Sequence, residues 1–204
     1  MSKIFTIGYS THTTETFIDL LQKNNITALA DVRSYPYSRH TPQFSIDFLK
    51  KALKEVGISY VFLGKELGAR SENTAYYRRG KIQYDLLAKD PLFIHGLERI
   101  HHGMKNYQIA LMCAEKDPLD CHRAVLISRN IKKYNVNIEH IHSDGNLETH
   151  RAMELRMLRL YDMSENDMFD SPEKILGNAY CIHGEKIAYQ DNVILEQELK
   201  GAKQ

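Results

Sequence analysis

The chain of 204 residues is long enough for one well-buried domain with a small appendage, and its 43% hydrophobic and 26% charged residues are typical of a globular protein. A formal net charge of +1 excludes gross electrostatic attraction to nucleic acid, and no apolar run approaches the roughly 20 residues that a membrane span needs. Three unevenly spaced cysteines make a poor disulfide framework, and the first residues lack a signal peptide's apolar stretch, so we expect a cytoplasmic protein.

Hydrophobic periodicity predicts that strands and helices alternate over the first two thirds of the chain. The predicted strands are 3–8, 26–33, 58–63, 107–113 and 136–142, and the predicted helices are 14–24, 45–56, 90–104 and 121–134. Residues 64–90 lack a clear period and form a long excursion. This alternation predicts an α/β fold with a mainly parallel sheet flanked by helices on both faces.

The last residues predict a helical and hairpin extension. A basic helix at 148–161 is followed by an acidic linker at 162–173, and residues 179–189 are compatible with a hairpin that turns at His183 and Gly184. We therefore expect an α/β domain at 1–146 that carries a pocket, with residues 147–204 packed on or beside it.

Polar side chains follow three of the predicted strands. In a parallel sheet, ligands bind beyond the carboxyl ends of the strands, so these segments are expected to converge on one pocket. The residues are Asp31, Arg33 and Ser34 after the second strand, Cys113 and Glu115 after the strand at 107–113, and His140, His142 and Asp144 at the end of the next strand.

The stretch LMCAEKDPLDCHRAVLIS, residues 111–128, holds the candidate catalytic residues Cys113, Glu115, Cys121 and His122. Cys121 and His122 fall in the first turn of a predicted helix, where the helix dipole and Arg123 favour a thiolate. The nearby carboxylates oppose this effect, and a buried inert Cys121 is the alternative. We expect Cys113 or Cys121 to be a nucleophile or a ligand contact, and His122, Glu115 and Asp31 to be acid–base or orienting groups.

A zinc site is a second interpretation of the same segment. Cys113, Cys121, His122 and His142 could supply sulfur and nitrogen ligands. The spacing does not match the short knuckles of structural zinc sites, and no second Cys-x-x-Cys pair is present. From the sequence we assign no metal ligand and no cofactor.

Arginines interleaved with aromatic residues form the other pattern. Guanidinium groups suit phosphate or carboxylate, and aromatic rings suit bases. The candidate ligand-binding residues are Asp31, Arg33, Ser34, Arg39, Arg70, Arg123 and His140. For Arg78 and Arg79 we favour an ordinary exposed loop, whereas Arg33 directly follows a buried strand beside Asp31 and is expected to line the pocket.

The same segments, in this order, carry a family resemblance. They are Ile7-Gly8-Tyr9-Ser10, Asp31 to Arg39, Leu67 to Arg70, Cys113 to Glu115, Cys121 to Arg123, and His140, Ile141 and Gly145. Over residues 3–150 the chain resembles the bacterial family called domain of unknown function 488, with Tyr9 where histidine is common. The resemblance implies a compact α/β domain with these residues at one pocket, and it supplies no activity. A looser likeness links the chain to rhodanese domains.

Three functional hypotheses follow. The leading one is an enzyme, or a sensor derived from an enzyme, that binds an anionic small molecule, a nucleotide or a nucleic-acid element. The second is a non-catalytic nucleic-acid-binding module that uses residues 70–81 and the basic helix at 151–159, with binding that weakens steeply as salt rises. The third is rhodanese-like sulfur handling through Cys113 or Cys121. The sequence predicts no membrane partner and does not indicate an oligomeric state.

Overall fold

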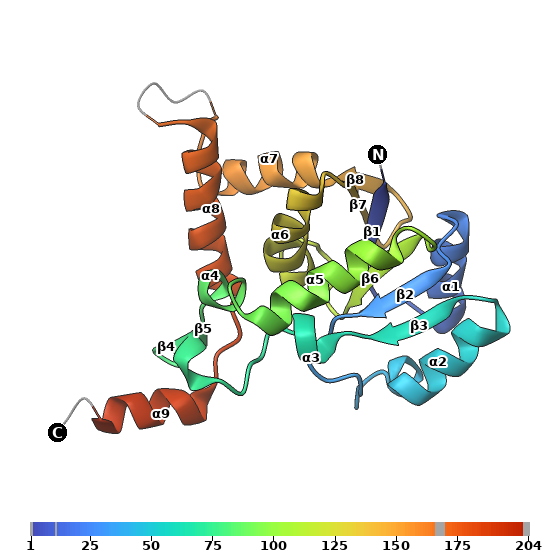
Figure 1. Ribbon diagram of the computed structural model, residues 1–204, viewed down its shortest axis with the longest axis horizontal. Helices are drawn as coiled ribbons and strands as arrows, with labels where there is room; N and C mark the ends of the chain where they lie inside the picture. Colours follow the sequence, from blue (N-terminus) through green and yellow to red (C-terminus); the bar gives the residue numbers. More distant parts are fainter. Residues whose placement is uncertain (1, 11, 166–169, 202–204) are drawn as a thin grey trace.

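A computed structural model describes residues 2–10, 12–165 and 170–201 of the chain. Within these residues six strands form one sheet in the order β3-β2-β6-β1-β7-β8. The strands are β1 (Lys3–Gly8), β2 (Ala28–Asp31), β3 (Ser59–Phe62), β6 (Ile109–Cys113), β7 (Asn137–Ile141) and β8 (Leu147–Thr149). All neighbours pair in parallel except β7 and β8, which are antiparallel (Figure 1). The predicted mainly parallel sheet is confirmed.

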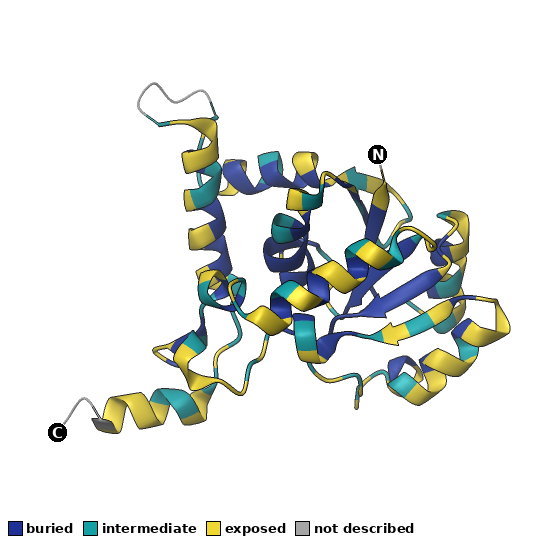
Figure 2. Cartoon of the chain, in the orientation of Figure 1, coloured by how far each residue is buried: buried dark blue, intermediate teal, exposed yellow. Residues whose placement is uncertain are grey.

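The central strands are apolar because helices cover both faces of the sheet. All five residues of β6 and all four of β2 are buried, as Figure 2 shows for the middle of the sheet. Helices α1 (Thr14–Lys23) and α2 (Ile46–Glu55) cover one face. Their Phe17, Leu21 and Leu53 pack in one core cluster with Ile7 and Met112 of the sheet.

The opposite face carries α3 (Gly64–Leu67), α5 (Pro91–Gly103) and a helical segment from Arg123 to Tyr134. Phe93, Leu97 and Ile127 form a second core cluster with Leu111 and Ile138. Asp90 caps α5 by accepting a hydrogen bond from the backbone N–H of Leu92, with Pro91 in the first turn.

The helix predicted at 121–134 is not a regular α-helix. It starts with a π-helical turn, η3 (Arg123–Ser128), continues as α6 (Arg129–Ile131) and ends in the 3-10 turn η4 (Lys132–Tyr134). The Ser128 hydroxyl donates to the carbonyl of Arg123 at 2.8 Å, which satisfies a carbonyl within the wider turn. Short π-helical turns occur frequently at functional sites.

The excursion at 64–90 contains short elements between α3 and α5. They are the 3-10 turn η2 (Thr74–Tyr76), the antiparallel pair β4 (Tyr77–Arg78) and β5 (Lys81–Ile82), and α4 (Tyr84–Leu87). Arg79 and Gly80 make the two-residue turn of this hairpin, and both have positive φ. That geometry is typical of a two-residue hairpin turn.

The predicted hairpin at 179–189 is wrong. The basic segment forms α7 (His150–Leu160), and residues 172–187 form the continuous helix α8 (Pro172–Ile187), followed by α9 (Asn192–Gly201). Ser171 caps α8, and Ile175, Ala179 and His183 recur at helical spacing on its buried side. Within this short stretch, the alternation of apolar and polar residues therefore suggested strands and concealed the 3.6-residue period of a helix. Residues 166–169 of the acidic linker lie outside the described residues.

The C-terminal segment joins the main fold. Strand β8 extends the sheet, and Met153, Met157 and Tyr180 belong to the core cluster under the sheet's second face. Helix α9 lies away from the sheet and is mostly exposed (Figures 1 and 2). Among the described residues, no helix is long and apolar enough to cross a membrane.

Candidate functional site

A cavity of about 700 Å³ opens beyond the carboxyl ends of β1, β2 and β6. This is the edge at which ligands bind in parallel α/β sheets. Of the residues predicted from the sequence, Cys113, Glu115, Cys121, His122, Arg33, Ser34, Arg39 and Arg70 line it. The segments that follow β2 and α3 supply its arginines, whereas the segment that follows β6 supplies its thiols and carboxylates.

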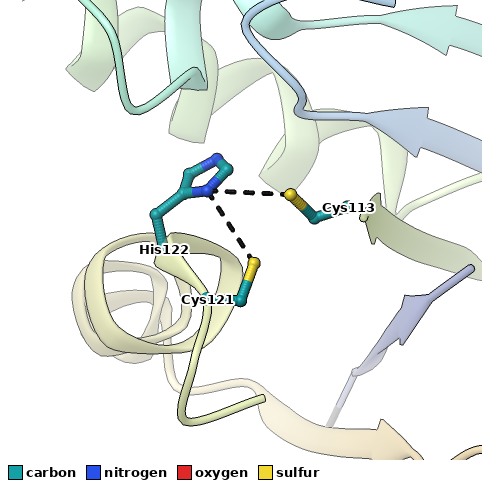
Figure 3. Close-up of side chains that lie close together, drawn as sticks. All are labelled: Cys113, Cys121 and His122. Atoms are coloured by element: carbon teal, nitrogen blue, oxygen red, sulfur yellow. Dashed lines mark hydrogen bonds between the residues drawn. The ribbon is translucent and has the colours of Figure 1, made fainter. Parts of the chain in front are cut away.

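A cluster of two thiols and an imidazole lies in the cavity wall (Figure 3). Cys113 is the last residue of β6, and Cys121 and His122 immediately precede the π-helical turn. The Nδ1 atom of His122 lies 3.8 Å from Cys113 Sγ and 3.8 Å from Cys121 Sγ. All three side chains are buried. The fold therefore joins donors that are eight and nine residues apart in the sequence.

Backbone contacts fix the orientation of the cluster. His122 Nε2 lies 3.0 Å from the carbonyl oxygen of Val32, which can only accept, so Nε2 carries the hydrogen and Nδ1 faces the sulfurs. The N–H of Arg123 donates to Cys121 Sγ at 3.4 Å. Cys113 pairs in register with Gly8 of β1, which holds the strand end in place.

The two thiols are inequivalent. The pKa of Cys113 is raised, first by its hydrogen bond to Cys121 and then by burial. Burial alone would raise the pKa of Cys121 too, but the Cys113 hydrogen bond and the Arg123 and His122 charges outweigh it and lower the pKa. For His122, burial is likewise outweighed by Cys121 and Glu115, so its pKa is raised. Cys121 therefore has the lower pKa of the two thiols and Cys113 the higher.

Glu115 completes the thiol side of the cavity. Its carboxylate accepts a hydrogen bond from Cys113 Sγ at 3.1 Å. Burial, followed by the charge of Cys121, raises the pKa of Glu115. The backbone of Glu115 passes so close to β1 that a side chain at Gly8 would overlap its carbonyl oxygen.

Arg123, a predicted ligand-binding residue, is fully buried and does not line the cavity. Its guanidinium group donates to the carbonyls of Glu115 at 2.7 Å and Lys116 at 3.1 Å. The side chain therefore holds the loop between Cys113 and Cys121 from behind.

Asp31 and Arg33 form a buried ion pair. Their side chains are 0% and 5% exposed, and Arg33 Nη2 lies 2.6 Å from Asp31 Oδ2. Arg33 also donates to the carbonyl of Phe44 at 2.9 Å, and the Tyr60 hydroxyl donates to Asp31 at 2.7 Å. Arg33 reaches the cavity, whereas Asp31 lies behind it. Arg33 Nη1 has no hydrogen-bond partner among the described residues.

His140, another predicted ligand-binding residue, is buried outside the cavity wall. Its Nδ1 lies 2.8 Å from the Thr6 hydroxyl, and its Nε2 lies 3.0 Å from His150 Nδ1. His142 instead contacts Glu148 at 2.9 Å. The histidines at the end of β7 therefore join a structural network and do not join the cysteine cluster.

Among the cavity residues that the sequence did not identify as site residues are Tyr9, Tyr84, Ile187 and Tyr189. Tyr9 stands in the Ile7–Ser10 motif, which was a usable signal. Tyr189 lies between α8 and α9, and its ring stacks under the Arg70 guanidinium with 4.2 Å between Cζ and the ring centre. No local pattern in the sequence connects Tyr189 with Arg70, 119 residues earlier.

The fold and the cavity place the chain in a recognisable class of α/β domain with a cysteine–histidine–arginine motif at the sheet's carboxyl edge. The family model described as domain of unknown function DUF488 matches residues 13–129, more than half of the chain. The protein belongs to this family. Neither the comparison with curated proteins nor that with solved structures found a match, and nothing supports the looser likeness to rhodanese domains.

Proposed function

We propose that the protein is an enzyme, or a sensor derived from an enzyme, that binds an anionic ligand of the nucleotide type in the cavity. The observation that carries the proposal is that two arginines without an ion-pair partner among the described residues line the cavity together with exposed tyrosine rings. Arg39 and Arg70 line the cavity and form no ion pair among the described residues. Tyr35 and Tyr37, on the same wall, are 67% and 66% exposed.

The chemistry of this wall suits a ligand with a phosphate or carboxylate and a planar ring. Guanidinium forks hydrogen-bond such anions in bidentate fashion. Exposed tyrosine rings provide faces on which a base can stack. Tyr35 also lies under Arg70, with 5.5 Å from Arg70 Cζ to the ring centre, so the anion site and the stacking site adjoin.

The segment that follows β6 supplies reactive groups to the same cavity. Cys113, Glu115, Cys121 and His122 come from the segment after β6 and line the same cavity. A ligand held by Arg39 and Arg70 would face thiol, carboxylate and imidazole groups. These groups are the usual means of nucleophilic and acid–base catalysis.

The test is binding of the four 5′-mononucleotides, the matching nucleosides and inorganic phosphate, measured by calorimetry. We expect mononucleotides to bind more tightly than either fragment. Arg70→Ala should weaken binding by about tenfold or more, because a charge-assisted hydrogen bond is lost. Arg78→Ala is the matched control, since Arg78 is exposed on β4 and does not line the cavity. Absence of binding, or equal losses in the two variants, would refute the proposal.

The nucleic-acid-binding alternative receives less support from the basic helix α7. Arg156 pairs with Asp117 at 2.8 Å and with Glu148 at 2.9 Å, and Arg151 pairs with Glu165. Guanidinium groups that are already neutralised release few counterions on binding a phosphate backbone. A single-stranded oligonucleotide that binds tightly, with steep salt dependence and with a loss in Arg78→Ala at least equal to that in Arg70→Ala, would favour this alternative over the cavity.

A further inference from the structure

The cysteine–histidine cluster has the composition of a soft-metal site. Two sulfurs and one imidazole nitrogen, from Cys113, Cys121 and His122, lie within 4.8 Å of one another. Thiolate and imidazole together favour zinc among the common metal ions, whereas calcium and magnesium prefer oxygen ligands. The sequence spacing argued against zinc because a zinc knuckle takes both cysteines from one turn. Here a strand end and a helix start supply them.

The imidazole is already oriented as a ligand. The Nε2–H of His122 donates to the Val32 carbonyl at 3.0 Å, which leaves the Nδ1 lone pair directed at both sulfurs (Figure 3). Metal-bound histidines almost always donate their other ring N–H to a carbonyl or a carboxylate in this way.

A backbone hydrogen bond likewise favours Cys121 Sγ as a metal ligand. It accepts a hydrogen bond from the backbone N–H of Arg123 at 3.4 Å, which stabilises negative charge on the sulfur. Zinc–sulfur and zinc–nitrogen bonds of about 2.3 and 2.0 Å place donor atoms slightly closer than the 3.8 Å seen between His122 and each sulfur. Small side-chain rotations close that difference.

We propose that Cys113, Cys121 and His122 bind one Zn²⁺ ion, whose fourth coordination position faces the cavity. All three residues line the cavity, so a water or an anionic ligand group has access to that position. Three protein ligands with one open position are the arrangement of catalytic zinc sites, whereas structural sites are closed by four protein ligands. The proposal goes beyond nucleotide binding and stands without it.

The charges balance in the buried cluster. Zn²⁺ displaces the protons of the two thiols, and the neutral imidazole adds none, so the metal and its thiolates carry no net charge. Glu115, whose carboxylate lies 3.1 Å from Cys113 Sγ, and Arg123, which donates to the Glu115 carbonyl at 2.7 Å, lie beside the cluster. Burial of a neutral set costs far less than burial of a free thiolate.

The first measurement is the metal content of the full-length protein, produced with added zinc and purified without chelator, by inductively coupled plasma mass spectrometry. We expect one zinc per chain in the wild type and in Cys181→Ser, because Cys181 is exposed on α8 outside the cluster. Cys113→Ser, Cys121→Ser and His122→Gln should each lose most of the zinc. Circular dichroism of each variant reports whether it folds.

A second measurement needs no variant. The zinc-stripped wild type is titrated with Co²⁺, and we expect the intense visible bands of tetrahedral cobalt with thiolate-to-cobalt charge transfer. Zn²⁺ should abolish these bands and should protect Cys113 and Cys121, but not Cys181, from alkylation.

A wild type that binds neither zinc nor cobalt would overturn the proposal, as would zinc loss in Cys181→Ser equal to that in Cys121→Ser. A Cys113–Cys121 disulfide in protein kept under reducing conditions would also overturn it. Two further measurements separate failure of this proposal from failure of the proposed function. Nucleotide binding by the zinc-stripped protein tests the proposed function without zinc. Zinc binding by Arg70→Ala tests the zinc site without the arginine proposed to hold the nucleotide.

Discussion

Gly8 ends β1 beside Cys113, and the site depends on its lack of a side chain. A Cβ atom at this position would lie 1.8 Å from the Glu115 carbonyl oxygen and 3.3 Å from Arg123 Nη2. The backbone of the Cys113–Cys121 loop therefore packs directly on the end of the central strand. The glycine of the Ile7–Ser10 motif is explained by this close approach, a reason that the sequence alone did not reveal.

Gly8→Ala should destabilise the protein by about 1–3 kcal/mol, because the loop must move to admit a methyl group. The reactivity of Cys113 and Cys121 toward alkylation should change with it. Gly177→Ala is the control: a Cβ there meets nothing within 4 Å on α8, and we expect a gain of about 0.5–1 kcal/mol. Urea unfolding measures both. A Gly8→Ala protein with wild-type stability and cysteine reactivity would contradict the role of this contact.

The Asp31–Arg33 pair shows why Arg33 is a poor choice for testing ligand binding. Arg33→Ala would leave the Asp31 carboxylate buried without its cation, and we expect a cost of about 3–5 kcal/mol. Lys174→Ala, which breaks the surface pair between Lys174 of α8 and Asp170 just before this helix, should cost less than about 1 kcal/mol. Urea unfolding compares the two variants, and similar losses would mean that Asp31 is satisfied by Tyr60 and the backbone alone.

At the scale of elements, a chain of buried hydrogen bonds joins the sheet to the C-terminal helices. Thr6 contacts His140, which contacts His150 at 3.0 Å, and His150 Nε2 lies 2.9 Å from the Tyr180 hydroxyl. Tyr180 donates to Glu154, which also pairs with Lys132 at 2.7 Å. Each polar group has a partner, so β1, β7, α7 and α8 are held in one register.

His140 and His150, the two histidines of this hydrogen-bond network, predict that the protein loses stability in acid. Burial, followed by the charge of Lys132, lowers the pKa of His150 from 6.5 to about 3, and burial, followed by the charge of His150, lowers that of His140 well below 6.5. The charges of Arg123, His142 and Arg156 also act on His140, whereas Glu148 partly opposes the lowering at His150. Below pH 6.5 the unfolded chain binds protons that the folded chain does not, so stability falls as pH falls toward 3.

Each such histidine contributes up to about 1.4 kcal/mol of unfolding free energy per pH unit in that window. His150→Gln should therefore be less stable than the wild type near neutral pH but lose stability less steeply on acidification. Urea unfolding at several pH values between 6.5 and about 4 gives the two slopes. Parallel slopes would mean that His150 is not buried as a neutral group.

The elements also show what the sequence could and could not predict. The strands and the helices of residues 3–63 and 90–142 were found because each buries one face or both, which leaves a periodic apolar pattern. The hairpin at 179–189 was wrong because buried Ala179, Tyr180 and His183 belong to a helix whose partners lie far away in sequence. The sequence predicted the residues of the cysteine cluster but not their arrangement in space, because the π-helical turn and the Val32 contact orient them.

At the scale of the whole molecule, the C-terminal segment helps to build both the core and the cavity. Ile187 and Tyr189 line the cavity, and Tyr189 supports Arg70. Backbone bonds tie this region to the small hairpin: Ile82 donates to the Tyr189 carbonyl at 3.1 Å, and Asp191 donates to the Gly80 carbonyl at 2.7 Å. Residues far beyond the family match thus shape the wall that is expected to hold the ligand.

Two truncations test whether residues 1–146 form a domain of their own. A chain ending at Asn146 loses β8 and the buried side chains of Met153, Met157 and Tyr180, which are 0–3% exposed. That loss is on the order of 5 kcal/mol or more, comparable with the whole stability of a typical domain, so we expect no cooperative unfolding transition. A chain ending at Asp191 loses only the mostly exposed α9 and should fold, with the cavity's Tyr189 in place. Circular dichroism during thermal unfolding distinguishes them. A cooperative transition in the shorter chain would show instead that the sheet and its helices fold without the C-terminal segment, and that this segment serves the cavity alone.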